Sequence, residues 1–128
     1  MSTDSISPRD HSILVVEDEQ LVRAIAVDTL RDAGFRVTEA RHAQDALEAL
    51  NHADFDLMFT DIRMPGEVDG LRLAHMARDL RPRMKIVLTS GHLGEDPSAG
   101  RAPGMGDFLA KPYRPDMLLA CIDALLHG

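Results

Sequence analysis

Short apolar runs alternate with amphipathic segments along this chain. The runs are rich in aliphatic and β-branched residues, which is typical of strands buried on both faces of a parallel sheet. The segments between them carry apolar residues at helical spacing. We expect strands at residues 12–17, 35–40, 55–60, 85–90 and 107–111. We expect helices at residues 19–33, 43–50, from 69 or 70 to 81, and 114–126.

This alternation predicts the fold class. Strands that alternate with helices form a parallel sheet with right-handed crossovers and helices on both faces. We therefore expect an α/β domain with a doubly wound, five-stranded parallel sheet. In the first helix, the apolar stripe expected to face the sheet is Leu21, Ile25, Thr29 and Leu30. Glycine and proline recur between Gly91 and Gly106, so we expect a fourth helix in that segment to be short or disordered.

The ends of the chain set the expected domain limits. Residues 1–11 are mostly polar and are expected to form a flexible leader, and residues 12–126 are expected to form one domain. Only His127 and Gly128 follow, so we expect any signal to pass to another protein or to act within a larger polypeptide.

Composition narrows the possible partners. The formal net charge is -7, and no cluster of Lys and Arg offers a surface for nucleic acid or for an anionic membrane. No apolar stretch is long enough to cross a bilayer. The single cysteine, Cys121, lies in an apolar helical pattern and is expected to pack rather than react. We expect a cytoplasmic protein that binds neither nucleic acid nor membrane.

Polar and charged side chains stand at the ends of four expected strands. In a parallel sheet these ends share one edge, so residues distant in the sequence meet there. Three carboxylates at such an edge repel by roughly 4 kcal/mol per pair at about 4 Å, which calls for a cation. Oxygen ligands without His or Cys favour Mg²⁺ over zinc. The residues are Glu17 with Asp18, Asp61, Thr89 with Ser90, and Lys111.

Asp61 has two interpretations on its own. It ends the run Leu57 to Asp61 and precedes Pro65-Gly66, so it could face a crevice at the carboxyl edge of the sheet. Aspartate beside proline and glycine also commonly caps a turn. Convergence with the other strand ends favours the first interpretation.

Taken together, these motifs resemble a response-regulator receiver domain over residues 12–126. The resemblance rests on the Glu17-Asp18 pair, Asp61 followed by Met64-Pro65-Gly66, a hydroxyl residue at the fourth strand end, and Lys111-Pro112. It implies a flavodoxin-like sheet with strand order 2-1-3-4-5.

The resemblance also implies roles for single residues. Asp61 would be the phosphoacceptor, which takes a phosphoryl group from phosphohistidine on a histidine kinase or a histidine phosphotransfer protein. Mg²⁺ would be held by Glu17, Asp18, Asp61 and the backbone carbonyl of Arg63. Lys111 would pair with a phosphoryl oxygen.

Two positions stay open at the level of sequence. Thr89 and Ser90 are adjacent, and successive strand residues point to opposite faces, so only one hydroxyl can reach the phosphoryl group. Ser90 is favoured because Ser90-Gly91 resembles the hydroxyl-then-small-residue pair of the receiver family, whereas Thr89 better fits that family's usual spacing to Lys111. By the same resemblance, Phe108 would match the aromatic that moves inward in phosphorylated receiver domains; the alternative is a simple core residue.

Three kinds of function fit these residues. The first is a stand-alone receiver that switches a binding surface or acts as a phosphate shuttle or sink. The second is a phosphatase with an aspartate nucleophile, which would need a second carboxylate where Arg63 stands. The third is a receiver-like interaction module that is not phosphorylated. We expect the first, as a monomer or weak dimer, with no enzyme activity beyond self-phosphotransfer and slow autodephosphorylation.

Overall fold

The computed structural model describes residues 11–64, 68–91 and 107–127. These residues contain a five-stranded parallel sheet with the order β2-β1-β3-β4-β5, which confirms the expected fold class and strand order. The strands are β1 (Ser12–Val16), β2 (Arg36–Ala40), β3 (Leu57–Asp61), β4 (Lys85–Ser90) and β5 (Asp107–Ala110).

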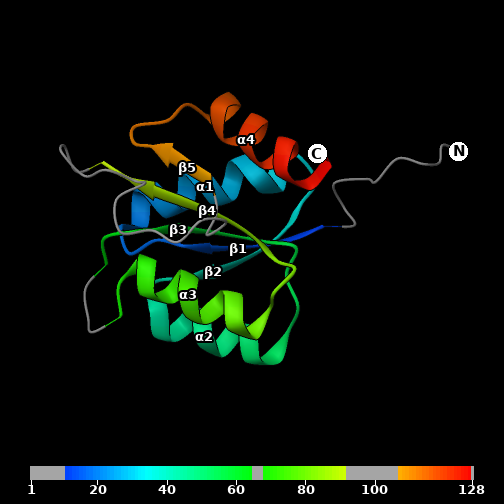
Figure 1. The fold of residues 1–128 in the computed structure, drawn as a ribbon. Coiled ribbons are helices and arrows are strands. Elements are labelled where there is room, and N and C mark those ends of the chain that lie inside the picture. Colours follow the sequence, from blue (N-terminus) through cyan, green and yellow to red (C-terminus); the bar gives the residue numbers. More distant parts are fainter. Residues whose placement is uncertain (1–10, 65–67, 92–106, 128) are drawn as a thin grey trace, which may run out of the picture.

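Two pairs of helices cover the two faces of the sheet (Figure 1). One pair is α1 (Gln20–Asp32) with α4 (Pro115–His127), and the other is α2 (Ala43–His52) with α3 (Gly70–Leu80). Each of these four helices follows a strand, as the alternating sequence pattern predicts. Among the described residues, no helix is long and apolar enough to cross a membrane.

The pleat of the central strands divides the core into two layers. Along β1, Ile13 and Val15 pack in the layer beneath α1 and α4, whereas Leu14 and Val16 pack in the layer beneath α2 and α3. All four side chains are almost fully buried. Since alternate residues of a strand point to opposite faces, this continuous apolar run belongs to a strand covered on both sides.

The predicted stripe of α1 is wrong in part. Leu30 is buried, but Leu21 is 79% exposed and Ile25 is 58% exposed. The helix instead turns Ala26 and Val27 toward the sheet. Apolar residues lie on more than one side of this helix, so their spacing alone does not decide which side packs. The consequence is an uncovered apolar surface on α1.

Two other predictions fall at the limits of the described residues. The proposed leader covers residues 1–11, of which residues 1–10 lie outside the described part. His11 is buried, and its carbonyl accepts a hydrogen bond from the Arg36 N–H at 3.1 Å. The fourth helix expected between Gly91 and Gly106 falls almost wholly on residues 92–106, which also lie outside the described part.

Candidate functional site

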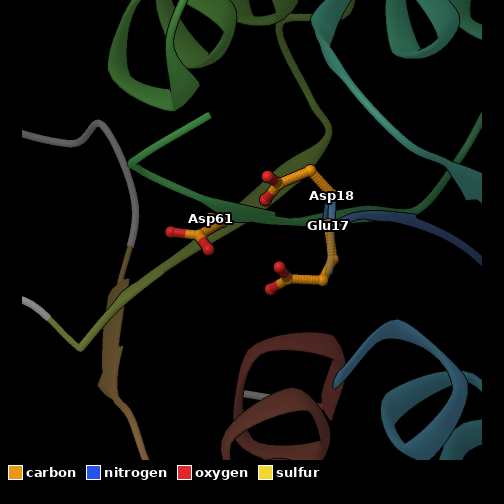
Figure 2. Close-up of side chains that lie close together, drawn as sticks. All are labelled: Glu17, Asp18 and Asp61. Carbon is orange, nitrogen blue, oxygen red and sulfur yellow. The ribbon is translucent and has the colours of Figure 1, made fainter. Parts of the chain in front are cut away.

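The candidate site lies at the carboxyl edge of the sheet. Glu17 and Asp18 follow the last residue of β1, and Asp61 is the last residue of the neighbouring strand β3. Figure 2 shows Glu17 and Asp18 leaving adjacent backbone positions in opposite directions, with Asp61 between them. The parallel topology therefore brings Asp61 to the adjacent pair Glu17-Asp18, as predicted.

The three carboxylates form a compact group of oxygen ligands. One carboxylate oxygen from each of Glu17, Asp18 and Asp61 lies within 4.8 Å of the other two. Glu17 and Asp61 are only 4% and 6% exposed, whereas Asp18 is exposed and gives the group access to solvent. Hard oxygen donors of this kind suit Mg²⁺, which binds through a few carboxylates and keeps several waters. The donor set therefore fits the predicted ion.

Lys111 joins this group from the end of β5. Its Nζ lies 2.8 Å from Glu17 Oε1 and 2.7 Å from Asp61 Oδ2. Burial alone would lower the pKa of Lys111, but the hydrogen bonds to Asp61 and Glu17 outweigh burial and raise the pKa. The ammonium group thus stays charged and bridges two of the three acids.

The Glu17 carboxylate is buried and accepts a hydrogen bond on each of its two oxygens. Burial raises the pKa of Glu17 and outweighs the lowering effect of the hydrogen bond from Lys111, and the Asp61 charge raises it further. Its Oε2 accepts a hydrogen bond from the Glu19 N–H at 3.0 Å. One ammonium group faces three carboxylates here, so the site keeps a negative charge that a divalent cation would neutralise.

Backbone contacts fix Asp61 and the loop after it. The Arg63 N–H donates to Asp61 Oδ1 at 3.0 Å, and the Lys111 ammonium donates to the other carboxylate oxygen, Oδ2. The Gly70 N–H donates to the Ile62 carbonyl at 2.8 Å and closes the loop. A Cβ at Gly70 would lie 1.8 Å from the Asp61 carbonyl oxygen, so only glycine permits this approach. The role of the Arg63 carbonyl as a metal ligand stays a prediction.

Both candidate hydroxyl residues are buried at the end of β4. Thr89 pairs in register with Asp61, and its Oγ1 is buried without a hydrogen-bond partner among the described residues. Ser90 is the last residue of β4, and its carbonyl accepts a hydrogen bond from the Lys111 N–H at 3.1 Å. Ser90 is therefore one residue nearer to the open edge, while the choice between the two hydroxyls stays a prediction.

Phe108 lies in β5, apart from the acids. It is half-buried and packs against the core layer beneath α2 and α3. Its partner in register on β4 is Leu88. This position is that of a core residue that is still partly exposed to solvent. The inward movement of Phe108 in the phosphorylated state stays a prediction.

Three residues of the site escaped the sequence reasoning. Gly70 carries a recognisable signal, because Asp69-Gly70 directly precedes an apolar helical stripe. Arg23 donates a hydrogen bond to the Glu17 carbonyl, and the position of Arg23 in the sequence does not indicate this contact. The third is Tyr113, whose ring packs edge to face on Phe59.

Tyr113 also borders an apolar hollow beside the acids. Burial, and next the negative charge of Glu17, raise the pKa of Tyr113 to about 12. The hollow has a volume of about 370 Å³. Its lining comes from α1 and from the segments after β4 and β5, and consists of Val22, Ile25, Gly91, Lys111, Pro112 and Tyr113.

Comparison with known families gives one clear match. The family described as the response regulator receiver domain matches residues 13–123. A solved structure, the response regulator receiver protein from Sinorhizobium medicae, superposes with a TM-score of 0.84 at 34% identity. The match covers 92% of this chain and 95% of that one.

Longer regulatory proteins are also similar in sequence. PetR of Rhodobacter capsulatus is 37% identical over 118 residues, which cover 90% of this chain and 48% of PetR. The C4-dicarboxylate transport transcriptional regulatory protein DctD of Rhizobium meliloti is 39% identical over 111 residues, which cover 84% of this chain and 24% of DctD. The chain thus spans about half of the first relative and a quarter of the second.

Proposed function

Because this chain belongs to the response regulator receiver domain family, we propose that it is a phosphoacceptor, with Asp61 as the residue that receives the phosphoryl group. The donor is phosphohistidine on a histidine kinase or on a histidine phosphotransfer protein. The main support is the position of Asp61, whose carboxylate lies between two further acids and the ammonium of Lys111. This combination supplies a nucleophile, a cation site and a counter-charge at one edge of the sheet.

The proposed reaction moves one phosphoryl group between two side chains. An oxygen of the Asp61 carboxylate forms a bond to phosphorus while the bond from phosphorus to the donor imidazole nitrogen breaks. The donor nitrogen keeps the electron pair and regains a proton, and Asp61 becomes an acyl phosphate. Such transfers depend mainly on positioning and on neutralisation of charge, with little other covalent chemistry required from the protein.

The residues around Asp61 divide these tasks. Glu17, Asp18 and Asp61 would hold Mg²⁺, which neutralises charge on the phosphoryl oxygens when bound. Lys111 already contacts Asp61 Oδ2, so a short movement brings its ammonium to a phosphoryl oxygen. The Arg63 N–H orients the carboxylate through Oδ1.

The switch proposed for the phosphorylated state involves Ser90 and Phe108. Phosphorylation adds about -1.5 to -2 charges and strong acceptor oxygens, which attract a nearby hydroxyl donor. We assign Ser90 to this role because the Thr89 Oγ1 is shut away from solvent. Movement of the β4 end would reach Phe108 through the adjacent strand β5, where Phe108 is only half-buried.

The apolar surface of α1 supports a protein donor. Ile25 is 58% exposed and lines the same hollow as Lys111, which also contacts Asp61. A donor protein seated on this surface would present its phosphohistidine to Asp61. Ile25→Glu is expected to slow transfer from a phosphorylated histidine kinase while leaving transfer from acetyl phosphate unchanged, because the small donor needs no docking surface.

A second candidate is a receiver-like module that binds a partner without phosphorylation. The relatives named above include a transcriptional regulatory protein, and a regulatory output through a further protein would suit either candidate. The complete set of acids, hydroxyl and lysine favours phosphorylation. A cytoplasmic location is part of this proposal, because the donor kinases act on soluble partners.

The experiment that separates the candidates is a phosphotransfer assay. Native protein and Asp61→Asn are incubated with a phosphorylated histidine kinase, with Mg²⁺ and with a chelator. The proposal expects label on native protein with Mg²⁺ only and none on Asp61→Asn. Absence of label on native protein from both a kinase and acetyl phosphate would leave the phosphorylation-independent module as the better account.

A further inference from the structure

Arg23 connects helix α1 to the acidic end of β1 and to the neighbouring strand β2. Its side chain is only 13% exposed. The Nη1 group donates to the Glu17 carbonyl at 2.9 Å, and Nε donates to Glu39 Oε1 at 3.1 Å. One guanidinium group therefore holds the backbone oxygen of Glu17, directly after β1, and the carboxylate of Glu39 in β2.

The carbonyl that Arg23 holds has a particular place in the site. It belongs to the peptide group that links Glu17 to Asp18, the two adjacent acids of the cation site. The N–H on the other side of Glu17 donates to the Ala40 carbonyl at 3.0 Å. Since both neighbouring peptide groups are fixed, the backbone sets the directions in which the two acidic side chains leave (Figure 2).

We infer that Arg23 is a positioning residue that orients the peptide group between Glu17 and Asp18 and thereby sets the affinity of the acid site for a divalent cation. This inference rests on the proposed function, in which these acids hold Mg²⁺. Groups that orient metal ligands without touching the metal commonly change metal affinity by roughly 10- to 100-fold when removed. Arg23 meets that description through the contact with the Glu17 carbonyl.

Charge alone predicts that removal of Arg23 strengthens cation binding, which is opposite to the weakening that a positioning role predicts. Arg23 is a cation near an anionic site, so its removal should strengthen the attraction of a second cation. Orientation predicts weaker binding, because the freed peptide can rotate and the buried Glu17 carbonyl loses its donor. The sign of the change therefore separates the two effects.

Arg31 provides a matched control on the same helix. It lies 3.8 Å from Glu39 Oε2 and donates to the Val37 carbonyl at 3.1 Å. It shares with Arg23 the charge, the helix and the carboxylate partner, but its hydrogen bonds and ion pairs among the described residues do not include the Glu17 carbonyl. Arg31→Ala thus removes a cation without releasing the peptide between the acids.

The test is a titration with Mn²⁺, followed by the electron paramagnetic resonance signal of the free ion, with Mg²⁺ as competitor. The proteins are native, Arg23→Ala, Arg23→Lys and Arg31→Ala, each checked for folding by circular dichroism. We expect Arg23→Ala to bind roughly tenfold more weakly than native protein. Arg31→Ala is expected to match native protein. Arg23→Lys is expected to fall between native and Arg23→Ala, because one ammonium cannot serve both acceptors equally well.

Each outcome bears on one claim. Saturable binding by native protein together with unchanged or tighter binding by Arg23→Ala overturns the role of Arg23. Absence of saturable Mn²⁺ and Mg²⁺ binding by native protein overturns the cation site of the proposed function itself. If Arg23→Ala does not fold, Arg23→Lys decides the matter, and an affinity equal to that of native protein overturns the inference.

Discussion

The two edges of the sheet carry similar residues but differ in charge balance. At the amino edge, Arg81 Nε pairs with Asp54 Oδ1 at 2.9 Å, and the Ser12 N–H donates to Asp56 Oδ2 at 2.8 Å. Each of these two acids has a partner of its own. At the carboxyl edge, three carboxylates lie close together, and the ammonium of Lys111 contacts only two of them, Glu17 and Asp61.

Hollow volume alone would favour the amino edge as a binding site, whereas the charge balance favours the carboxyl edge. The amino edge borders a cavity of about 520 Å³, and the hollow beside Lys111 measures about 370 Å³. The two acids that line the larger cavity each have a partner, because Asp54 forms an ion pair with Arg81 and Asp56 accepts a hydrogen bond from the Ser12 N–H. Unbalanced charge therefore distinguishes the edge that we propose to be functional, because it favours binding of a cation and cavity volume alone does not.

The largest effect on stability is expected from Gly70→Ala. The added Cβ would lie 1.8 Å from the Asp61 carbonyl oxygen and 2.7 Å from Ile62 Cα, so α3 must move away from β3. We expect a loss of about 3 kcal/mol in the free energy of unfolding, measured with urea. Gly91→Ala at the same edge is the control, since its Cβ would lie 3.2 Å from Lys111 Cβ. Equal stability of the two variants would contradict the close approach at Gly70.

The second effect concerns the counter-charge at each edge. Lys111→Met leaves the buried Glu17 and Asp61 without their ammonium, and we expect it to lower the free energy of unfolding by about 2 kcal/mol without divalent cations. Mg²⁺ should restore much of this loss and should bind more tightly than to native protein. Arg81→Met removes a cation at the amino edge, where each named acid has its own partner. We expect Mg²⁺ to stabilise this variant no more than it stabilises native protein. Thermal unfolding with and without Mg²⁺ measures this difference, and equal Mg²⁺ effects would contradict it.

The third effect separates the two hydroxyls. Ser90→Ala is expected to slow phosphorylation by roughly tenfold, because a donor to the developing phosphoryl charge is lost. Thr89→Ala is expected to leave the rate near that of native protein, since its Oγ1 is buried without a described partner. The rates are compared with acetyl phosphate as donor at fixed Mg²⁺. A large loss in Thr89→Ala with none in Ser90→Ala would reverse the assignment.

The smallest effect uses Tyr113, the single tyrosine in a chain without tryptophan. Its ultraviolet phenolate signal should appear at about pH 12, because burial and the Glu17 charge raise the pKa. A raised pKa means that the neutral phenol stabilises the fold below the unfolded pKa of about 10, and that this stability is lost as the pH rises through the folded value. Glu17→Gln should lower the pKa of Tyr113, because it removes a negative charge that raises this pKa. Titration of native Tyr113 near pH 10 would contradict its burial.

Sequence patterns predicted most of the fold and the position of the acidic group. Apolar runs predicted each strand of the described sheet, and the parallel topology brings Glu17, Asp18 and Asp61 together, because strand ends share an edge. The side of α1 that packs was not predictable, since Leu21 and Ala26 both lie in apolar patterns and the choice depends on the whole core.

Long-range contacts to backbone atoms explain the other omissions. The hydrogen bond from Arg23 to the Glu17 carbonyl depends on how α1 leaves the sheet, and a carbonyl has no signature in the sequence. The contact of Gly70 with Asp61 similarly depends on the path of the loop between them. Sequence reasoning identifies the reactive side chains better than the groups that orient them.

The most direct test of the account is to locate the phosphoryl group on the protein. Native protein is treated with acetyl phosphate, with Mg²⁺ and with a chelator, and the acyl phosphate is trapped by hydride reduction and mapped by peptide mass spectrometry. The account predicts one modified residue, Asp61, with modification only where Mg²⁺ is present. Modification at another carboxylate, such as Asp54 or Asp56 at the balanced edge, or equal modification without divalent cation, would contradict it.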